Sequence, residues 1–237
     1  MKNIKIGIVV ADMDEYKPLA ERVEKGEFEN YSFLKRKGHK FIVSAQKGRA
    51  EVYSLFCGIG KVNAAAAAAH FKDIGCDLIL NYGLSGGISG ISRGEISVCS
   101  KFVEHDFDLT GIGYKPCEKP WQEYVYTASQ ELISLFEEKY PDVKKGTAVS
   151  GDRFICDVDI KNALKENFDA MSCDMETAAI AYVCSYGDIP FMALRRISAD
   201  AGDDAAGNYR EMNDLAEAVL SDIILDFIPE IIDSDVI

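Results

Sequence analysis

Short runs of apolar and β-branched residues alternate with longer helical segments along the whole chain. Residues 77–82 are almost continuously apolar, as expected for a strand covered on both faces, and residues 61–72 are rich in alanine, the best helix former. Strands that alternate with helices pack as layers around a largely parallel or mixed sheet. Because no linker, repeat or low-complexity segment interrupts the pattern, the sequence predicts an α/β fold in a single domain, residues 1–237, with a central mixed β-sheet flanked by helices.

The same patterns place the individual elements. Strands are predicted at 4–10, 41–45, 51–57, 77–82, 96–103, 147–150 and 191–197. Helices are predicted at 61–72, 129–139, 175–186 and 212–231, and the acidic residues after the first strand are suited to begin a further helix. Gly187 is expected at the C′ position after the helix at 175–186, and segment 81–87 is expected to be a glycine turn.

The net charge restricts the partners. Lysine and arginine total 26 against 39 acidic residues, which gives a formal net charge of −13. Such a chain repels phosphate backbones and anionic lipids, so no nucleic-acid or membrane partner is expected, whereas a small neutral ligand feels little of the charge. No apolar stretch is long enough to span a bilayer, and the apolar N-terminal run leads into acidic residues instead of a signal-peptide cleavage site.

The cysteines and histidines favour a reducing compartment and no metal. The seven cysteines include no CxxC pair and mostly lie in apolar runs, which is typical of buried free thiols. The three histidines are scattered, and none pairs with a cysteine as a metal site would require. We therefore expect a cytoplasmic protein without a metal or another cofactor.

Candidate site residues follow the predicted strand ends. Ligands in sheets of this kind bind beyond the carboxyl ends of the strands. The segments just past the predicted strand ends are 11–15, 58–61, 83–87, 150–155, 173–176 and 198–204, and each contains glycine or a polar cluster. These six segments form the candidate pocket.

Two carboxylates in these segments have different surroundings. Glu15 belongs to the acidic segment 11–15, where helix capping is the simpler explanation and a general base is the alternative. Glu176 lies beside Met175 and alanines at a helix start, where an unpartnered carboxylate is costly to bury. A functional role for Glu176 is at least as well supported as a structural one, because a buried carboxylate can accept hydrogen bonds from two neighbouring ribose hydroxyls.

Two glycine-rich segments and one acidic cluster give weaker evidence of function than the two carboxylates do. CGIGK (57–61) favours a tight turn over an anion-binding loop, because it lacks the spacing of a Walker A motif. NYGLSGG (81–87) lacks the spacing of a dinucleotide-binding turn, and tight packing or close approach to a ligand would both explain it. HDFD (105–108) is expected to form a loop hydrogen-bond network and not a metal site.

Taken together, these segments resemble the nucleoside phosphorylase/nucleosidase superfamily and, within it, the 5′-methylthioadenosine/S-adenosylhomocysteine nucleosidases. The motifs KIGIV, GIGKVNAA, NYGLSGG, VSGDRFI, DMETAAIA and RRIS occur in the family's order between residues 5 and 198. VSGDRFI with DMETAAIA is a specific combination, and the resemblance covers essentially the whole chain. It implies a nucleoside phosphorylase-like fold, hydrolysis of the N-glycosidic bond of a purine nucleoside with release of adenine, and a role in methionine salvage.

The resemblance assigns roles to individual positions. Glu15 falls on the base that activates water, and Glu176 falls on the glutamate that holds the ribose hydroxyls. Phe154 falls on the aromatic residue that stacks on the purine, and Ile155 on the residue whose backbone contacts the base edge. The other positions implied to bind substrate are Ile59, Leu84, Gly86, Met175, Arg195 and Ser198.

The resemblance also implies a homodimer. The loop from Ile112 to Tyr114 matches the one that family members insert into the neighbouring subunit's pocket. The implied partners are therefore a small purine nucleoside and a second copy of the chain.

One position departs from the family where the chemistry depends on it. The leaving purine needs a proton or a strong hydrogen bond at N7, which the family supplies from the aspartate of an ISD motif. This chain has Ala199 at that position, followed by Asp200. Three explanations are open. Asp200 supplies the acid after a one-residue shift of the turn, or Asp203 or Asp204 reaches the purine instead. In the third, no residue replaces the acid, and the chain binds nucleosides with impaired catalysis. We take Asp200 as the candidate acid.

Two further departures concern the sugar side. Leu84 stands where the nucleosidases usually have a small polar residue, and Asp12 stands where they are usually apolar. An acidic Asp12 would favour a polar or cationic 5′ substituent, unless it points to solvent.

The main rival to hydrolysis is a phosphate-dependent phosphorylase, but the glycine segments carry few arginines and Glu15 would repel the anion.

Overall fold

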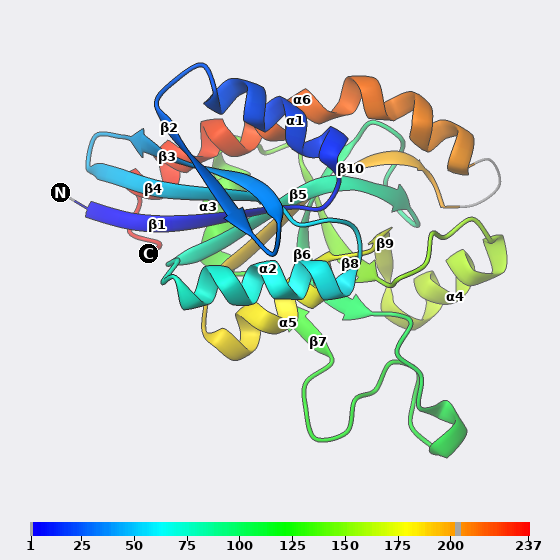
Figure 1. Cartoon of the computed structure of the whole chain (residues 1–237). Coiled ribbons are helices and arrows are strands. Elements are labelled where there is room, and N and C mark those ends of the chain that lie inside the picture. The colour runs from blue at the N-terminus through cyan, green and yellow to red at the C-terminus, as the bar shows by residue number, and fades with distance from the viewer. Residues whose placement is uncertain (1, 202–204) are drawn as a thin grey trace.

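The described strands form one mixed sheet in the computed structural model (Figure 1). The structure describes residues 2–201 and 205–237, and it describes the side chains of residues 2–201 and 218–237. The strands are β1 (Lys2–Val10), β2 (Phe28–Phe33), β3 (Arg36–Ser44), β4 (Gly48–Phe56), β5 (Leu78–Gly87), β6 (Ile96–Glu104), β7 (Val125–Thr127), β8 (Lys144–Ser150), β9 (Ala170–Asp174) and β10 (Phe191–Asp200). The helices are α1 (Met13–Val23), α2 (Lys61–Asp73), η1 (Thr110–Ile112), α3 (Gln130–Lys139), α4 (Val158–Phe168), α5 (Thr177–Gly187) and α6 (Ala205–Asp233). The predicted α/β architecture, a mixed sheet with flanking helices, is confirmed.

The sheet closes on itself at one end. Its strand order is β10-β6-β8-β9-β5-β1-β4-β3-β2, and β10 also pairs with β5, so β5, β9, β8, β6 and β10 form a ring. Strand β5 runs parallel to β1 on one side and to β10 on the other. Because these three strands are parallel, their carboxyl ends meet at one edge, where ligands of such sheets bind.

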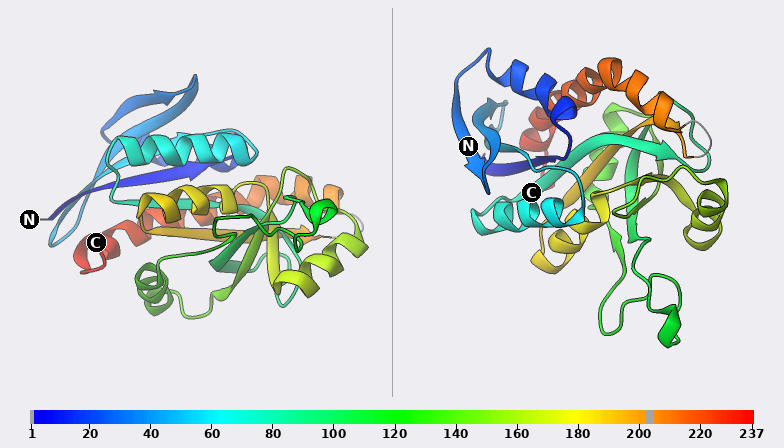
Figure 2. Two further views of the ribbon diagram at one scale, coloured as in Figure 1. Left: turned by 90° about the horizontal axis from the view of Figure 1, so that it is seen from below. Right: turned by 45° about the vertical axis from the view of Figure 1, so that its right-hand side comes forward.

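Helices cover both faces of the sheet. α1 packs along α6 on one face, and α2 packs along α5 on the other (Figures 1 and 2). Gly7 on β1 allows α2 to approach, because a Cβ at this position would lie 2.5 Å from a ring carbon of Phe71. Protein interiors are already close-packed, so no larger residue fits between this strand and this helix.

Strand β5 corrects one sequence prediction. It extends to Gly87, so segment 81–87 belongs to a strand and is not a turn. None of its glycines has a positive φ; instead, a Cβ on Gly86 would meet the sulfur of Cys173, and one on Gly87 would meet Ile197. Glycine, usually a turn signal, here permits the close approach of β9 and β10 to β5.

The other element predictions need smaller corrections. The prediction omitted β2, β7, β9 and α4, and it began α6 too late. Gly187 is the last residue of α5, and the left-handed position after the helix is occupied by Asp188, whose φ is 54°. Aspartate tolerates this conformation better than most residues, so the helix ends one residue later than the glycine suggests.

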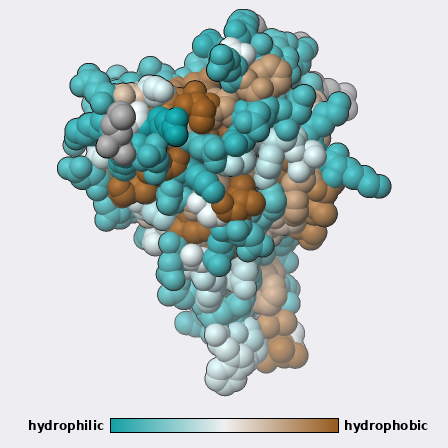
Figure 3. Space-filling view, turned by 60° about the vertical axis from the view of Figure 1, so that its left-hand side comes forward, coloured by the Kyte–Doolittle hydropathy of each residue, from teal (hydrophilic) through white to brown (hydrophobic). Residues whose placement is uncertain are grey.

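Residues 105–124 project from the body of the molecule between β6 and β7 (Figures 1 and 2). Ile112 is 72% exposed in this segment and Trp121 is 99% exposed. The space-filling view shows a projection at the bottom of the molecule with hydrophobic residues along one side (Figure 3). The segment thus presents apolar surface away from the core.

The substitution Gly7→Ala is expected to lower the free energy of unfolding by about 1–3 kcal/mol, the usual cost of overpacking. The added methyl group overlaps the Phe71 ring, so strand and helix must separate. Gly111→Ala is the matched control, since a Cβ there meets no atom within 4 Å. Urea unfolding measures both variants, and equal stabilities would contradict this packing argument.

Candidate active site

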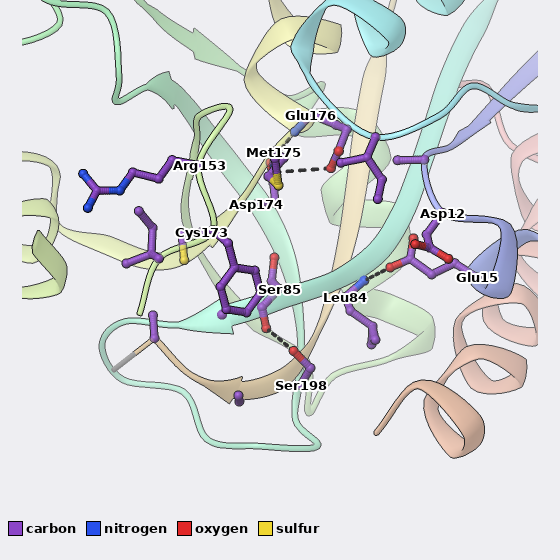
Figure 4. A pocket seen from close by; sticks show the side chains of 17 residues that line it. Asp12, Glu15, Leu84, Ser85, Arg153, Cys173, Asp174, Met175, Glu176 and Ser198 are labelled. Atoms are coloured by element: carbon purple, nitrogen blue, oxygen red, sulfur yellow. Dashed lines mark hydrogen bonds between the residues drawn. The ribbon is translucent and has the colours of Figure 1, made fainter. Parts of the chain in front are cut away.

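A cavity of about 190 Å³ opens at the carboxyl ends of β1, β5 and β10 (Figure 4). All six segments predicted from the strand ends contribute to its lining. The predicted site residues that line it are Glu15, Ile59, Leu84, Gly86, Phe154, Ile155, Met175, Glu176 and Ser198. The rule that places ligands beyond strand ends therefore located this cavity correctly.

Glu15 enters the cavity from the first turn of α1. Helix capping is done by Asp12, whose side chain accepts a hydrogen bond from the backbone N–H of Asp14. Glu15 is buried, and its Oε1 accepts a 2.8 Å hydrogen bond from the backbone N–H of Leu84. Burial, opposed by that hydrogen bond, raises the pKa of Glu15 to about 8. A buried carboxyl group that the cap does not use supports a chemical role.

Glu176 faces the same cavity from the N-cap position of α5. Its Oε1 accepts a 2.8 Å hydrogen bond from the backbone N–H of Gly60, and its Oε2 accepts one of 3.3 Å from that of Met175. Burial and then the nearby charge of Asp174 raise the pKa of Glu176 to about 7. Two backbone donors fix the carboxylate and leave lone pairs on both oxygens for the hydroxyls of a ligand.

The CGIGK segment supplies one of those donors. Gly58 and Gly60 have φ values of 89° and 102°, which glycine adopts readily, so the predicted tight turn is confirmed. The turn directs the N–H of Gly60 at the carboxylate of Glu176. In this structure the turn holds a site residue, Glu176, through a backbone N–H group.

A buried ion pair lies behind Glu176. Arg195 Nε donates a 2.9 Å hydrogen bond to Asp174 Oδ2, and Arg195 Nη2 donates one of 2.5 Å to Asn81. Asp174 Oδ1 accepts hydrogen bonds from the backbone N–H groups of Glu176 and Thr177 at the start of α5. Burial disfavours the charge on Asp174, but Arg195 and the hydroxyl donors around it keep the pKa of this carboxyl below its usual range.

The role predicted for Arg195 therefore has to be corrected. It was predicted to bind substrate, but it does not line the cavity and is only 1% exposed. Its guanidinium group is turned toward Asp174, Asn81 and Thr177, which use its donors. The structure gives Arg195 a supporting position behind the site residues.

A loop hydrogen-bond network supports the opposite wall, which Phe154 and Ile155 line. The backbone N–H of Asp152 donates to Asp106 Oδ2 at 2.8 Å, and Asp152 Oδ1 accepts from the backbone N–H of Lys61 at 2.9 Å. Lys61 Nζ also donates to Asp106. The network predicted for HDFD is confirmed, and it ties the loop that carries Phe154 to the start of α2.

The role predicted for Asp200, that of the acid, also has to be corrected. The pairing of β10 with β5 has an irregularity between Ile197 and Ala199, after which Ala199 lines the cavity. The Asp200 side chain is 72% exposed and forms an ion pair with Lys161 of α4. It does not line the cavity, and Asp203 and Asp204 lie outside the described residues. Among the described residues, a methyl group thus occupies the position that the resemblance assigns to the acid.

The predicted neighbouring-subunit residues lie apart from the cavity. Ile112 and Tyr114 belong to the projecting segment 105–124 and do not contribute to the lining within one chain. Their predicted role requires a second copy and stays a prediction.

The predicted segments contain several lining residues to which no individual role was assigned, among them Ser85, Arg153, Cys173 and Asp174. Ser85 lies within the predicted segment 83–87, but the assignment of 81–87 to a turn gave no reason to single out its side chain. The position of Asp174, two residues before Glu176, suits a capping residue, and its carboxylate accepts a hydrogen bond from the backbone N–H of Glu176 at the helix start.

The described part of the chain has neither a metal-binding cluster nor a membrane-spanning helix. No group of three or more His, Cys, Asp and Glu side chains there is arranged to hold a metal ion. None of the helices described is both long enough and apolar enough to cross a membrane.

The model of the phosphorylase superfamily matches residues 5–229 of the chain. The chain belongs to the phosphorylase superfamily. A 5′-methylthioadenosine/S-adenosylhomocysteine nucleosidase from Staphylococcus carnosus is 32% identical over 230 residues, which cover 94% of this chain and 98% of the relative. The resemblance inferred from the motifs is therefore confirmed.

Solved structures show the same fold. A mutant Helicobacter pylori 5′-methylthioadenosine nucleosidase with 5′-methylthioadenosine in its active site has a TM-score of 0.90 at 24% identity, covering 97% of this chain and 100% of that one. A Streptococcus pneumoniae MTA/SAH nucleosidase in complex with 8-aminoadenine has a TM-score of 0.87 at 25% identity, covering 96% and 100%.

The substitution Glu15→Gln is expected to flatten the pH dependence of stability. Since burial raises the pKa of Glu15 from 4.5 to about 8, the folded state keeps a proton that the unfolded chain releases. The parent's free energy of unfolding should therefore fall between about pH 5 and pH 8, and glutamine removes this contribution. Urea unfolding at both pH values measures the effect, with the exposed Glu21→Gln of the same helix as control. A parent-like fall in Glu15→Gln would refute the raised pKa.

Proposed function

We propose that this protein is a purine nucleosidase that hydrolyses the N-glycosidic bond of 5′-methylthioadenosine/S-adenosylhomocysteine-type nucleosides and releases adenine. The observation that carries the proposal is the pair Glu15 and Glu176, two buried carboxyl groups that face one largely apolar cavity and are each fixed by backbone N–H groups. Paired carboxyl groups with raised pKa values in a cavity are typical of catalytic sites.

Glu176 is the group that binds the sugar. Its two oxygens retain acceptor capacity, so they suit the adjacent 2′ and 3′ hydroxyls of a ribose. Its negative charge also stabilises the oxocarbenium-like sugar that forms as the glycosidic bond breaks. Met175 and Ile59 provide apolar lining nearby.

Glu15 is the base that activates water. Its pKa of about 8 lies near neutral pH, where a base is strong enough to take a proton and is still ionised in a useful fraction of molecules. The water oxygen forms a bond to C1′ of the ribose, and one water proton passes to the Glu15 carboxylate. Phe154 and Ile155 line the other wall, where a purine base would lie.

The charges in the cavity favour water over phosphate as the attacking group. Arg153 is the only cationic residue in the described lining, whereas Asp12, Glu15, Asp174 and Glu176 are acidic. Phosphate binding needs several cationic donors, which the described lining does not provide, and each carboxylate that is ionised there repels the anion. Hydrolysis therefore has more support than phosphorolysis.

The Staphylococcus carnosus relative supports the substrate class, because its name specifies 5′-methylthioadenosine and S-adenosylhomocysteine. Asp12 and Leu84 both line the cavity, so the two departures from the family pattern lie where they can affect the substrate. We propose that they adjust the preference for the 5′ substituent. Such an activity would place the protein in methionine salvage.

We also propose a cytoplasmic homodimer. The exposed Ile112 and Trp121 of the projecting segment supply apolar surface for a second copy, which would bring Ile112 and Tyr114 to its partner's cavity. The seven cysteines are free, and six of them are buried, which suits a reducing compartment.

A nucleoside-binding protein with impaired catalysis is the second candidate. The observation that favours it is Ala199, which lines the cavity where the resemblance expects an acid. Loss of a general acid typically lowers a rate by about 10²–10⁴ and leaves binding intact.

The parent protein is expected to release adenine from 5′-methylthioadenosine without added phosphate. Ala199→Asp should raise the rate by about 10² or more, since it restores an acid to the lining. Chromatography of the free base measures both proteins, with and without phosphate. Release by Ala199→Asp alone would support the binding candidate. A rate that requires phosphate would overturn hydrolysis, and no release by either protein would overturn the substrate class.

A further inference from the structure

Ser85 has a hydroxyl group that the fold does not use. The residue lies near the end of β5, lines the cavity and is only 4% exposed. Its Oγ has no hydrogen-bond partner among the described residues. Buried polar groups nearly always have partners, and one left without a partner at a cavity wall calls for an explanation such as a ligand.

The neighbouring polar groups of the cavity are already engaged. Ser198 Oγ donates a 3.2 Å hydrogen bond to the backbone oxygen of Ser85, and Glu15 and Glu176 accept from backbone N–H groups. Figure 4 shows the Ser85 hydroxyl on the side of its backbone away from Ser198, directed toward Asp174 and Met175. Ser85 is therefore a neutral hydroxyl donor in the lining that is free to serve a ligand.

Ser85 also lies beside the position that lacks an acid. In the pairing of β10 with β5, Ile197 is opposite Ser85 and Ala199 is opposite Gly86, the next residue along β5. Glu15 lies beside the preceding residues of β5, where its carboxylate approaches Gly83 and Leu84. A nucleoside whose sugar contacts the two glutamates would thus place its base toward Ser85, Ser198 and Ala199.

We propose that Ser85 donates a hydrogen bond to N7 of the leaving purine and so takes over part of the role of the acid that Ala199 cannot provide. This inference rests on the proposed function for the identity of the base. As the bond between C1′ and N9 breaks, its electron pair passes to the purine, and the Ser85 hydroxyl stabilises the negative charge. Ser85 keeps its own proton, and the released base takes a proton from solvent.

Binding of free bases tests this contact without any need for turnover. Adenine has an acceptor at N7, whereas 7-deazaadenine carries a C–H group there. The parent protein is expected to bind adenine about 3- to 10-fold more tightly by isothermal titration calorimetry, the usual effect of one neutral hydrogen bond. Ser85→Ala should bind both bases with equal affinity.

Ser97→Ala is the matched control. Ser97 is a buried serine on the neighbouring part of the sheet that does not line the cavity, so its removal should preserve the preference for adenine. Equal binding of the two bases by the parent would overturn the proposal, and so would a preference that survives in Ser85→Ala. Because equal binding by the parent is enough to overturn the proposal, the parent comparison can refute it even if a variant does not fold.

A parallel assay of adenine release separates this proposal from the proposed function. If the parent releases adenine from the nucleoside but binds adenine and 7-deazaadenine equally, the proposed nucleosidase activity is supported and the role of Ser85 is overturned. The opposite result is also informative. If Ser85→Ala abolishes the parent's tighter binding of adenine, and neither the parent nor Ala199→Asp releases adenine from the nucleoside, the Ser85 contact is supported and the nucleosidase activity is overturned. Where the parent is active, Ser85→Ala should lower kcat by about 10-fold with little change in KM, because the bond strengthens as charge develops on the base.

Discussion

The buried ion pair between Asp174 and Arg195 holds together the elements on which the site depends. It connects the end of β9 to the middle of β10, and Arg195 also reaches Asn81 on β5. Each charge is stable in the interior only with the other present, and loss of one partner of such a pair typically costs about 3–5 kcal/mol. Because Asp174 also accepts hydrogen bonds from the start of α5, this ion pair determines where Glu176 stands.

Glu15 and Glu176 differ from Asp174 because neither forms an ion pair with a cation among the described residues. Burial raises the pKa of Glu15 to about 8 and that of Glu176 to about 7, and each is held by backbone N–H groups. Asp174, by contrast, stays ionised beside Arg195. The fold thus separates one carboxylate with a lowered pKa, which supports the structure, from two carboxyl groups that can exchange protons near neutral pH, as a site of acid–base chemistry requires.

The sequence located most of the site because strand ends converge in an α/β sheet however the side chains pack. That rule and the family motifs both led to Glu15 and Glu176. The roles of Arg195 and Asp200 could not be predicted, because they depend on which way each side chain of β10 points around the irregularity at Ser198. Segment 81–87 was assigned to a turn because the need for glycine there arises from Cys173 and Ile197, which are distant in sequence.

A crystal structure with 5′-methylthiotubercidin tests the central claim, that Glu176 binds a ribose whose reacting carbon faces Glu15. Carbon replaces N7 in this nucleoside, so its base cannot be protonated there to leave. We expect both ribose hydroxyls within hydrogen-bond distance of the Glu176 oxygens, C1′ on the side of Glu15, and the base between Phe154 and Ser85. A bound nucleoside whose hydroxyls make no contact with Glu176 would contradict the claim.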